Sequence, residues 1–183
     1  MENTRKTLIV NLFGAPGCGK STLAAALFSE LKKAGFNAEL VTEYANDKVY
    51  EKNQTVLQNQ IYIFGKQSYR ISRLDGQVDV VITDIPSLLS AIYHPKNDIQ
   101  AELEALVVKM FRSYWSFNVL LKRGFPYQTD GRIHTERQSD HIHEQLVNLL
   151  NKHHIPYSYY QASERTEVQL LKQIVEKISR KER

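Results

Sequence analysis

The residues best suited to chemistry form a glycine-rich stretch, G-x-x-x-x-G-K-S, near the start of the chain. It runs through Gly14, Ala15, Pro16, Gly17, Cys18, Gly19, Lys20, Ser21 and Thr22. Glycines allow positive φ angles and close backbone approach, so successive N–H groups of such a loop can turn inward around an anion. The spacing predicts that Lys20 reaches the β- and γ-phosphates of ATP and that Ser21 ligates a bridging Mg²⁺ ion.

The segments on either side of this loop have the pattern that a phosphate-binding loop requires. The apolar run 8–13 before it indicates a buried parallel strand. After the loop, apolar residues recur at helical spacing up to the helix-stop pair at 34–35; they are Leu23, Ala24, Leu27, Phe28 and Leu31. The loop would therefore lie at a helix N-terminus, where anions are favoured.

Two acidic residues are expected beside the loop because each follows a predicted strand. The strand 38–42 leads to Glu43, and the apolar strand 78–83 leads to Asp84. In open parallel sheets, ligands bind outside the carboxyl ends of the strands. Glu43 is a candidate general base, or else a cap for a helix beginning near Tyr44. Asp84 is a candidate to hold Mg²⁺ with the loop serine, or else a turn aspartate before a proline.

A long helix is predicted over 55–74, with one buried stripe formed by Leu57, Ile61, Phe64, Ile71 and Leu74. Its other faces carry polar side chains, among them Gln58, Gln60, Tyr62, Gln67, Arg70 and Arg73. Glutamine and tyrosine can pair with and stack on a flat heterocycle, while arginine can hold an anion. The candidates to bind an acceptor are therefore Glu43, Tyr44, Gln60, Tyr62, Gln67 and Arg70. A solvated helix face explains the same residues.

A polar, turn-rich segment follows the predicted fourth strand, 116–123, and is typical of a lid over 123–134. Arg123 and Arg132 flank it. Both are placed to meet the charge of a transferring phosphoryl group, and a solvated basic loop is the alternative.

The rest of the chain alternates helices and a last strand. Helices are expected over 103–111 and 135–152, a short strand over 156–160, and a terminal helix with the apolar stripe Val168, Leu171, Ile174, Val175 and Ile178. Five histidines lie in or beside the second of these helices: His134, His141, His143, His153 and His154. Without H-E-x-x-H spacing or a cysteine partner, polar surface is favoured over a zinc site.

The composition is that of one ordinary globular domain. The chain has 183 residues, 42% hydrophobic and 24% charged, so we expect a single domain over 1–183. The only cysteine, Cys18, excludes a disulfide within the chain. No apolar segment approaches membrane-spanning length, so we expect no membrane partner and a cytoplasmic location, in the host cytoplasm if the source is viral.

The net charge of +4 is concentrated in two stretches. Residues 58–74 carry three basic and no acidic side chains, and residues 109–137 carry six basic against two acidic ones. Such regions favour anionic ligands. Nucleic acid is a weaker candidate partner, because no basic tract of the sequence is interleaved with aromatic residues.

The alternation of five strands with helices predicts an α/β fold, a three-layer sandwich with a parallel sheet. The motifs resemble those of small P-loop kinases, such as the ribosylnicotinamide kinase domain of bacterial NAD-biosynthesis regulators, and of phage-encoded ATP-binding proteins of the AAA type. The resemblance covers most of the chain and rests on residues 14–22, 42–45, 60–70, 82–84 and 130–132. It implies the P-loop NTPase strand order 2-3-1-4-5.

The chain also resembles deoxynucleoside kinases, more distantly. In those enzymes a glutamate after the second strand is the base, which matches Glu43, and lid arginines match Arg123 and Arg132. Their Asp-Arg-Ser motif after the third strand is replaced here by Asp-Ile-Pro-Ser at 84–87. The resemblance implies a kinase with the catalytic residues Lys20, Glu43, Asp84, Arg123 and Arg132.

We therefore expect γ-phosphoryl transfer from ATP to a hydroxyl of a nucleoside-like small molecule, because a hydroxyl needs a base such as Glu43. The alternatives are a nucleotide monophosphate kinase, a kinase acting on a hydroxyl of nucleic acid (a 5′ end or a hydroxymethylated base), and a regulatory ATPase. The sequence gives no indication of oligomeric state.

Overall fold

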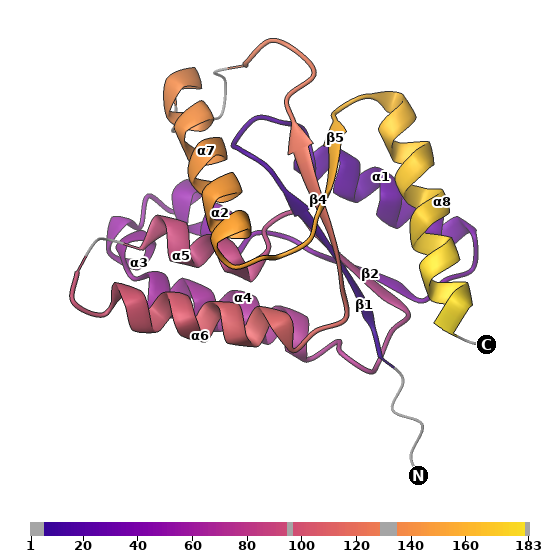
Figure 1. Ribbon diagram of the computed structural model, residues 1–183, viewed down its shortest axis with the longest axis horizontal. Coiled ribbons are helices and arrows are strands. Elements are labelled where there is room, and N and C mark those ends of the chain that lie inside the picture. The colour runs from indigo at the N-terminus through magenta and orange to yellow at the C-terminus, as the bar shows by residue number, and fades with distance from the viewer. Residues whose placement is uncertain (1–5, 95–96, 129–134, 182–183) are drawn as a thin grey trace.

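A parallel five-stranded sheet lies between two layers of helices in the computed structural model, which describes residues 6–94, 97–128 and 135–181 (Figure 1). The strands are β1 (Leu8–Phe13), β2 (Ala38–Val41), β3 (Val80–Thr83), β4 (Ser116–Lys122) and β5 (Ser158–Gln161). Their order in the sheet is β2-β3-β1-β4-β5, with every pair parallel. The predicted three-layer fold and the implied strand order are both confirmed.

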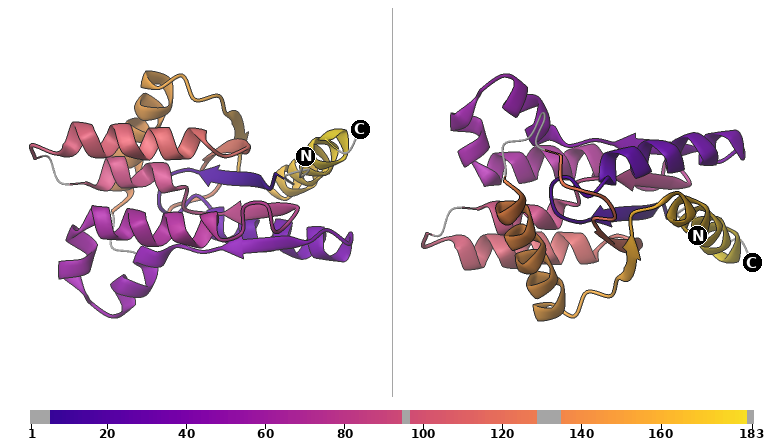
Figure 2. Two further views of the ribbon diagram at one scale, coloured as in Figure 1. Left: turned by 90° about the horizontal axis from the view of Figure 1, so that it is seen from below. Right: turned by 90° about the horizontal axis from the view of Figure 1, so that it is seen from above.

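Helices cover both faces of the sheet. They are α1 (Lys20–Lys33), α2 (Tyr44–Tyr50), α3 (Gln54–Gln58), α4 (Gln60–Ser72), the 3₁₀ helix η1 (Ser87–Leu89), α5 (Ser90–Tyr93), α6 (Gln100–Arg112), α7 (Glu136–Lys152) and α8 (Glu164–Lys181). Helices α1 and α8 pack on one face, and α4, α6 and α7 pack on the other (Figures 1 and 2). None of the described helices combines the length and the apolarity needed to span a membrane.

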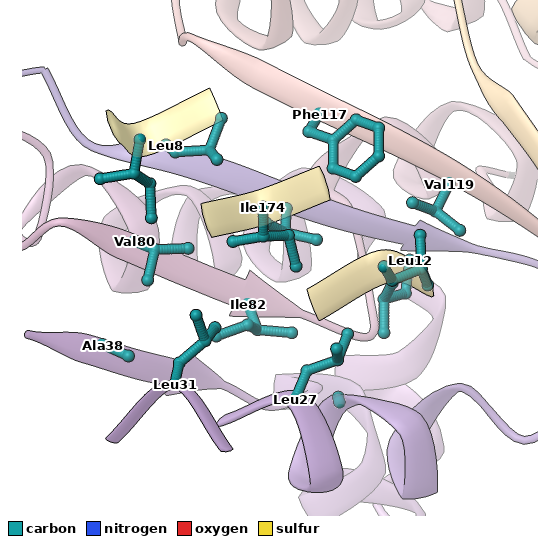
Figure 3. Packing of buried hydrophobic residues seen from close by; sticks show 14 of the residues in the cluster. Leu8, Leu12, Leu27, Leu31, Ala38, Val80, Ile82, Phe117, Val119 and Ile174 are labelled. Carbon is teal, nitrogen blue, oxygen red and sulfur yellow. The ribbon is translucent and has the colours of Figure 1, made fainter. Parts of the chain in front are cut away.

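The core explains why the sequences of the central strands β1 and β3 are mostly apolar. Every residue of β1 and β3 is buried, because helices cover both faces of these central strands. Figure 3 shows the α1–α8 face, where the strand residues Leu8, Leu12, Val80 and Ile82 meet Leu27, Leu31 and Ile174. Burying one such side chain stabilises the fold by about 1.5–3 kcal/mol. This core fixes the carboxyl ends of β1, β2 and β3, where the predicted site residues begin.

The long helix predicted over 55–74 is wrong in one respect: it is interrupted at Asn59. That residue has the non-helical angles φ −90° and ψ 80°, and its side chain accepts a hydrogen bond from the Tyr62 N–H. Asparagine favours such an N-cap over a helix interior because its side chain competes with the backbone for hydrogen bonds. The new helix start turns Ile61 outward, to 49% exposure, and Ile63 takes the buried position.

The apolar stripe of α8 also differs from the predicted one. Val168 is 70% exposed, whereas Leu170, Ile174 and Ile178 are buried. These three residues follow one another at a spacing of four, and they form the line that faces the sheet and α1. The terminal helix itself is present, and it spans Glu164–Lys181.

Candidate active site

The glycine-rich stretch forms a tight loop at the carboxyl end of β1, at the top of the sheet in Figure 1. Gly14 has φ 151°, and a Cβ atom there would lie 2.8 Å from the Leu121 carbonyl oxygen of β4. Gly19 has φ 88° and is the N-cap residue of α1. Cys18 lies beneath the loop with 1% exposure, so its thiol fills space. The loop backbone is therefore held against the sheet and leads directly into a helix N-terminus, the arrangement that binds phosphate.

Lys20 lies over this loop. Its Nζ donates hydrogen bonds to the carbonyl oxygens of Gly14 and Ala15, at 2.8 and 3.0 Å. A second contact holds the loop from the other side, because the Ser139 hydroxyl of α7 donates to the Pro16 carbonyl oxygen at 2.8 Å. Ser139 is fully buried, and the sequence offered no signal for its role, since one serine in an amphipathic helix is unremarkable there.

Ser21 and Asp84 meet as predicted. The Ser21 hydroxyl donates to Asp84 Oδ2 at 2.6 Å, a short, charge-assisted hydrogen bond. Asp84 is 8% exposed, and its buried Oδ1 has no hydrogen-bond partner in the described part of the chain. A buried acceptor without a partner is rare and needs an explanation. Because hydroxyl and carboxylate oxygens are the ligands that Mg²⁺ prefers, this pair fits a magnesium ion.

Glu43 follows β2 and is the N-cap residue of α2, but its side chain makes no capping hydrogen bond. Glu43 thus occupies the N-cap position that the alternative interpretation expects, but its side chain does not cap the helix. Burial raises the pKa of Glu43 above its ordinary value; the positive charge of Lys20 opposes this rise, and the negative charge of Asp84 adds to it. The structure thus brings Glu43 within electrostatic range of the loop lysine and of the carboxylate after β3. A raised pKa makes a carboxylate a stronger base toward an acceptor proton.

Two side chains of α4 hold the backbone around Glu43. The Gln67 side-chain oxygen accepts a hydrogen bond from the Tyr44 N–H at 3.1 Å, and its amide nitrogen donates to the Thr42 carbonyl oxygen at 3.4 Å. Arg70 donates to the same Thr42 oxygen at 3.1 Å. Gln67 is only 3% exposed, so water cannot easily replace these contacts. The residues before and after the glutamate are therefore fixed to α4.

The two glutamines of α4 do not lie on its open faces, where the sequence placed them. Gln60 is 7% exposed, and its amide donates to the Leu57 carbonyl oxygen at 2.8 Å, across the break between α3 and α4. Gln67 is buried as described above. A buried amide is stable only when its hydrogen bonds are satisfied, and both glutamines use their amides within the protein. Neither side-chain amide is therefore free to form hydrogen bonds with a nucleobase of the acceptor.

The two predicted tyrosines do lie together near Glu43. Tyr44 and Tyr62 pack edge to face with ring centres 5.9 Å apart, and their hydroxyl oxygens are 3.2 Å apart. The Arg70 guanidinium lies 5.2 Å from the Tyr44 ring centre. The sequence missed a third tyrosine, Tyr93, whose pKa is raised by burial and by the charge of Glu43. Tyr93 closes a short helix that carries no motif, so only the fold reveals it.

The start of the predicted lid packs closely on the sheet. A Cβ atom on Gly124 would lie 2.1 Å from the Ala162 carbonyl oxygen, so only glycine fits there. Arg123 donates to Glu136 at 2.8 Å and to Asp140 at 3.0 Å, both on α7. Its charge is thus already met by two carboxylates. Arg132 lies outside the described residues.

Two of the described histidines pair with carboxylates on helix surfaces. His153 pairs with Glu104 of α6, and His141 lies 3.8 Å from Glu144. In the described ranges no group of three histidine, cysteine, aspartate or glutamate side chains could hold a metal ion. His134 lies outside those ranges.

Comparison with known proteins gives one family match and several similar folds. Residues 9–166 match the model of a family described as an AAA domain. No curated protein sequence matches the chain. A deoxyadenosine kinase from M. mycoides with bound dATP is 17% identical with a TM-score of 0.58, and with the products dCMP and dCDP it is 14% identical with a TM-score of 0.56. Each alignment covers 92% of this chain and 99% of that one. A shikimate kinase from Bacteroides thetaiotaomicron is 13% identical with a TM-score of 0.49, covering 92% and 98%.

Proposed function

Since the chain belongs to the AAA domain family, we propose that it is an ATP- and Mg²⁺-dependent kinase whose acceptor is a hydroxyl of a nucleoside-like molecule. In this reaction the acceptor oxygen forms a bond to the γ-phosphorus and the bond between that phosphorus and the ADP oxygen breaks. The hydroxyl proton passes to the Glu43 carboxylate. The similar fold of the deoxyadenosine kinase agrees with this proposal.

The observation that carries the proposal is the placement of Glu43. Its carboxylate lies within electrostatic range of Lys20 and Asp84, and burial raises its pKa. A hydroxyl must lose its proton on attack and so gains from a base, whereas an acceptor phosphate is already anionic and needs cations instead.

The arginines favour the same choice. A monophosphate kinase needs arginines that are free to bind the acceptor phosphate. Arg70 is engaged with the Thr42 carbonyl and, at 3.4 Å, with Asp47. Arg123 is engaged with two carboxylates of α7. Arg70 and Arg123 are therefore already paired, which favours a hydroxyl acceptor over a phosphate. Arg73, at the end of α4, has no carboxylate partner in the described residues and is the arginine on which a phosphate acceptor would depend.

The remaining roles follow from position. The loop N–H groups and Lys20 would hold the β- and γ-phosphates, and Ser21 and Asp84 would hold the Mg²⁺ ion. When bound, that ion supplies positive charge next to the phosphate oxygens. Tyr44, which follows Glu43 in the chain, packs against Tyr62, and Tyr93 lies within electrostatic range of the same glutamate, so these tyrosines would receive the acceptor. A lid over 123–134 would cover the transferring group, and Arg123 would take part only on leaving its two carboxylate partners on α7.

Transfer of labelled γ-phosphate tests the proposal directly. The acceptor panel should contain nucleosides (nicotinamide riboside and deoxyadenosine among them), nucleoside monophosphates and DNA with a free 5′-hydroxyl or a hydroxymethylated base. We expect label on a nucleoside hydroxyl and ATP turnover that rises with acceptor concentration. Label on a monophosphate would favour the first alternative, and hydrolysis that no acceptor accelerates would favour a regulatory ATPase.

Asp84→Asn is expected to weaken magnesium binding and so to raise the Mg²⁺ concentration that transfer requires. The amide keeps the size of the carboxylate but removes its charge, and loss of such a group near a metal typically lowers metal affinity by about 10–100-fold. Transfer should therefore fall at low Mg²⁺ and recover in part when Mg²⁺ is raised. A magnesium titration of transfer rate measures this, with the exposed turn variant Asp75→Asn as the charge-matched control. An unchanged titration curve for Asp84→Asn would show that Asp84 does not hold the magnesium ion.

Gln67→Met is expected to lower the turnover number by about 10–100-fold without changing the KM for ATP. The variant releases the backbone on both sides of Glu43, and a misplacement of about 1 Å in a reacting group can cost about 10²-fold in rate. Steady-state kinetics and a pH–rate profile measure this effect. Because Glu43 would lose its fixed surroundings, the acid limb of that profile should also move.

Gln60→Met is the matched control for this prediction. Gln60 is as buried as Gln67 on the same helix, but its amide hydrogen bond leads to Leu57 rather than to the Glu43 segment. Each variant loses side-chain hydrogen bonds to the backbone, and a typical hydrogen bond contributes about 0.5–1.5 kcal/mol, so both should lose stability to a similar degree. Equal turnover losses in the two variants would show that Gln67 has only a structural role.

A further inference from the structure

Helix α4 presents a stripe in which aromatic and basic side chains alternate. The stripe consists of Tyr62, Lys66, Tyr69 and Arg73, and we call it the α4 stripe. Successive members are four, three and four residues apart, so they share one face of the helix. All four side chains are exposed, Tyr62 at 42% and Tyr69 at 66%. Figure 2 (left) shows α4 along the outside of its helix layer.

The α4 stripe carries positive charge that is not cancelled locally. In residues 6–94, 97–128 and 135–181, no carboxylate pairs with Lys66 or Arg73. The Lys66 ammonium lies 5.4 Å from the Tyr62 ring centre. Residues 44–73 hold five basic and two acidic side chains, so this segment contributes three of the four net positive charges of the chain. An anionic ligand with flat rings would complement such a surface.

The α4 stripe begins at the candidate active site. Its first member, Tyr62, packs against Tyr44, which directly follows Glu43 in the chain. From Tyr62 the stripe runs along α4 for about 16 Å, at about 1.5 Å per residue. Tyr69 therefore lies about 10 Å from Tyr62 along the helix axis. That separation exceeds the reach of one nucleoside seated at Glu43, so the second tyrosine would serve a longer ligand.

We propose that the α4 stripe binds single-stranded nucleic acid, and that the acceptor nucleoside is the terminal unit of the bound strand. The second clause rests on the proposed kinase function; the first does not. Tyrosine rings stack on unpaired bases, and the basic side chains between them pair with the intervening phosphates. A duplex fits less well, because its bases are stacked on one another and cannot meet the tyrosines. The acceptor hydroxyl would then reach Glu43 at the end of the stripe.

Binding of a fluorescent single-stranded 15-mer, followed by anisotropy without ATP, tests the α4 stripe. Stacking on one aromatic side chain is typically worth roughly a 5–100-fold change in affinity, so Tyr62→Ala/Tyr69→Ala should weaken binding by at least about 25-fold. Lys66→Gln/Arg73→Gln should reduce the slope of log affinity against log salt by about 1.4, because two phosphate contacts are lost. The same 15-mer as a duplex should bind more weakly than the single strand.

Variants on other elements give matched controls. Lys172→Gln/Lys177→Gln removes two charges from α8, on the opposite face of the sheet, and Tyr159→Ala removes a tyrosine of β5 that is 54% exposed. These changes should leave affinity for the 15-mer within about twofold, since surface substitutions away from a contact usually have small effects. The melting temperature of each variant shows that it is folded.

The outcomes separate the two proposals. Oligonucleotide binding is measured without ATP and tests only the α4 stripe. Transfer to a free nucleoside tests only the role of Glu43 as the general base. Absence of oligonucleotide binding, equal losses in stripe and control variants, or preference for the duplex would each overturn the stripe proposal while leaving the kinase proposal standing. Single-strand binding that depends on the stripe, together with transfer to no acceptor, would overturn the kinase proposal instead.

Discussion

Replacing Lys20 by alanine is expected to lower phosphoryl transfer by at least about 10²–10³-fold, the typical cost of removing one fixed donor from a charged transition state. The Nζ of Lys20 already lies over the loop, on the Gly14 and Ala15 carbonyl oxygens. It therefore needs only a small side-chain movement to reach the phosphates of ATP. Labelled transfer and ATP binding are the measurements, and both should fall.

The control for this change lies on the same helix. Lys33→Ala removes an exposed lysine that pairs with Glu30 in the last turn of α1. Such exposed pairs contribute little to stability, and this one is far along the helix from the loop. Both variants should stay folded, because Lys20 and Lys33 lie outside the core. Normal transfer by Lys20→Ala would show that the loop does not bind the transferred phosphate, and would contradict the kinase proposal.

The sequence predicts the fold and the phosphate loop well because both depend on strong local signals. The apolar runs of β1 and β3 have no explanation other than strands covered on two faces. The loop motif needs glycines at fixed positions, and Gly14 shows the reason, since a Cβ atom there would meet the β4 backbone. The Ser21–Asp84 pair follows as soon as β1 and β3 are neighbours.

The rest of the site depends on contacts that no local pattern contains. Gln67 looks like a surface residue in the sequence, and only the approach of β2 to α4 gives its amide two backbone partners. The loop contact of Ser139 and the position of Tyr93 beside Glu43 arise in the same way. Asn59 differs from these residues, because its helix cap is a local signal. The helical spacing of the apolar residues on either side of Asn59 nevertheless predicts one continuous helix.

The α4 stripe was hidden for a related reason. No stretch of consecutive residues alternates between aromatic and basic types, so nucleic acid is only a weak candidate partner from the sequence. Helical spacing brings Tyr62, Lys66, Tyr69 and Arg73 onto one face of α4, and the packing of the opposite face on the core leaves this face exposed. The pattern is clear once the four residues are placed on one helix and their exposure is known.

Glu43→Gln is expected to lower transfer by about 10²–10⁴-fold while ATP still binds, because the amide keeps the shape of the side chain but cannot accept the proton. The pH dependence gives an independent readout. Wild-type transfer should decline as the pH falls through the pKa of Glu43, which burial raises above the ordinary glutamate value. This acid limb should be absent from the residual activity of the variant.

The same substitution should make the protein more stable at pH values above the folded pKa of Glu43. A glutamate whose pKa is raised in the folded state binds its proton more tightly there than in the unfolded chain, so its ionisation costs stability as the pH rises through the folded pKa. Glutamine removes that cost. The gain in melting temperature should be full above the folded pKa of Glu43 and disappear below the ordinary glutamate pKa, where wild-type Glu43 is protonated in both states. A Glu43→Gln protein with near-normal transfer to its best acceptor would show that no base is needed, and would place a phosphate acceptor ahead of a hydroxyl.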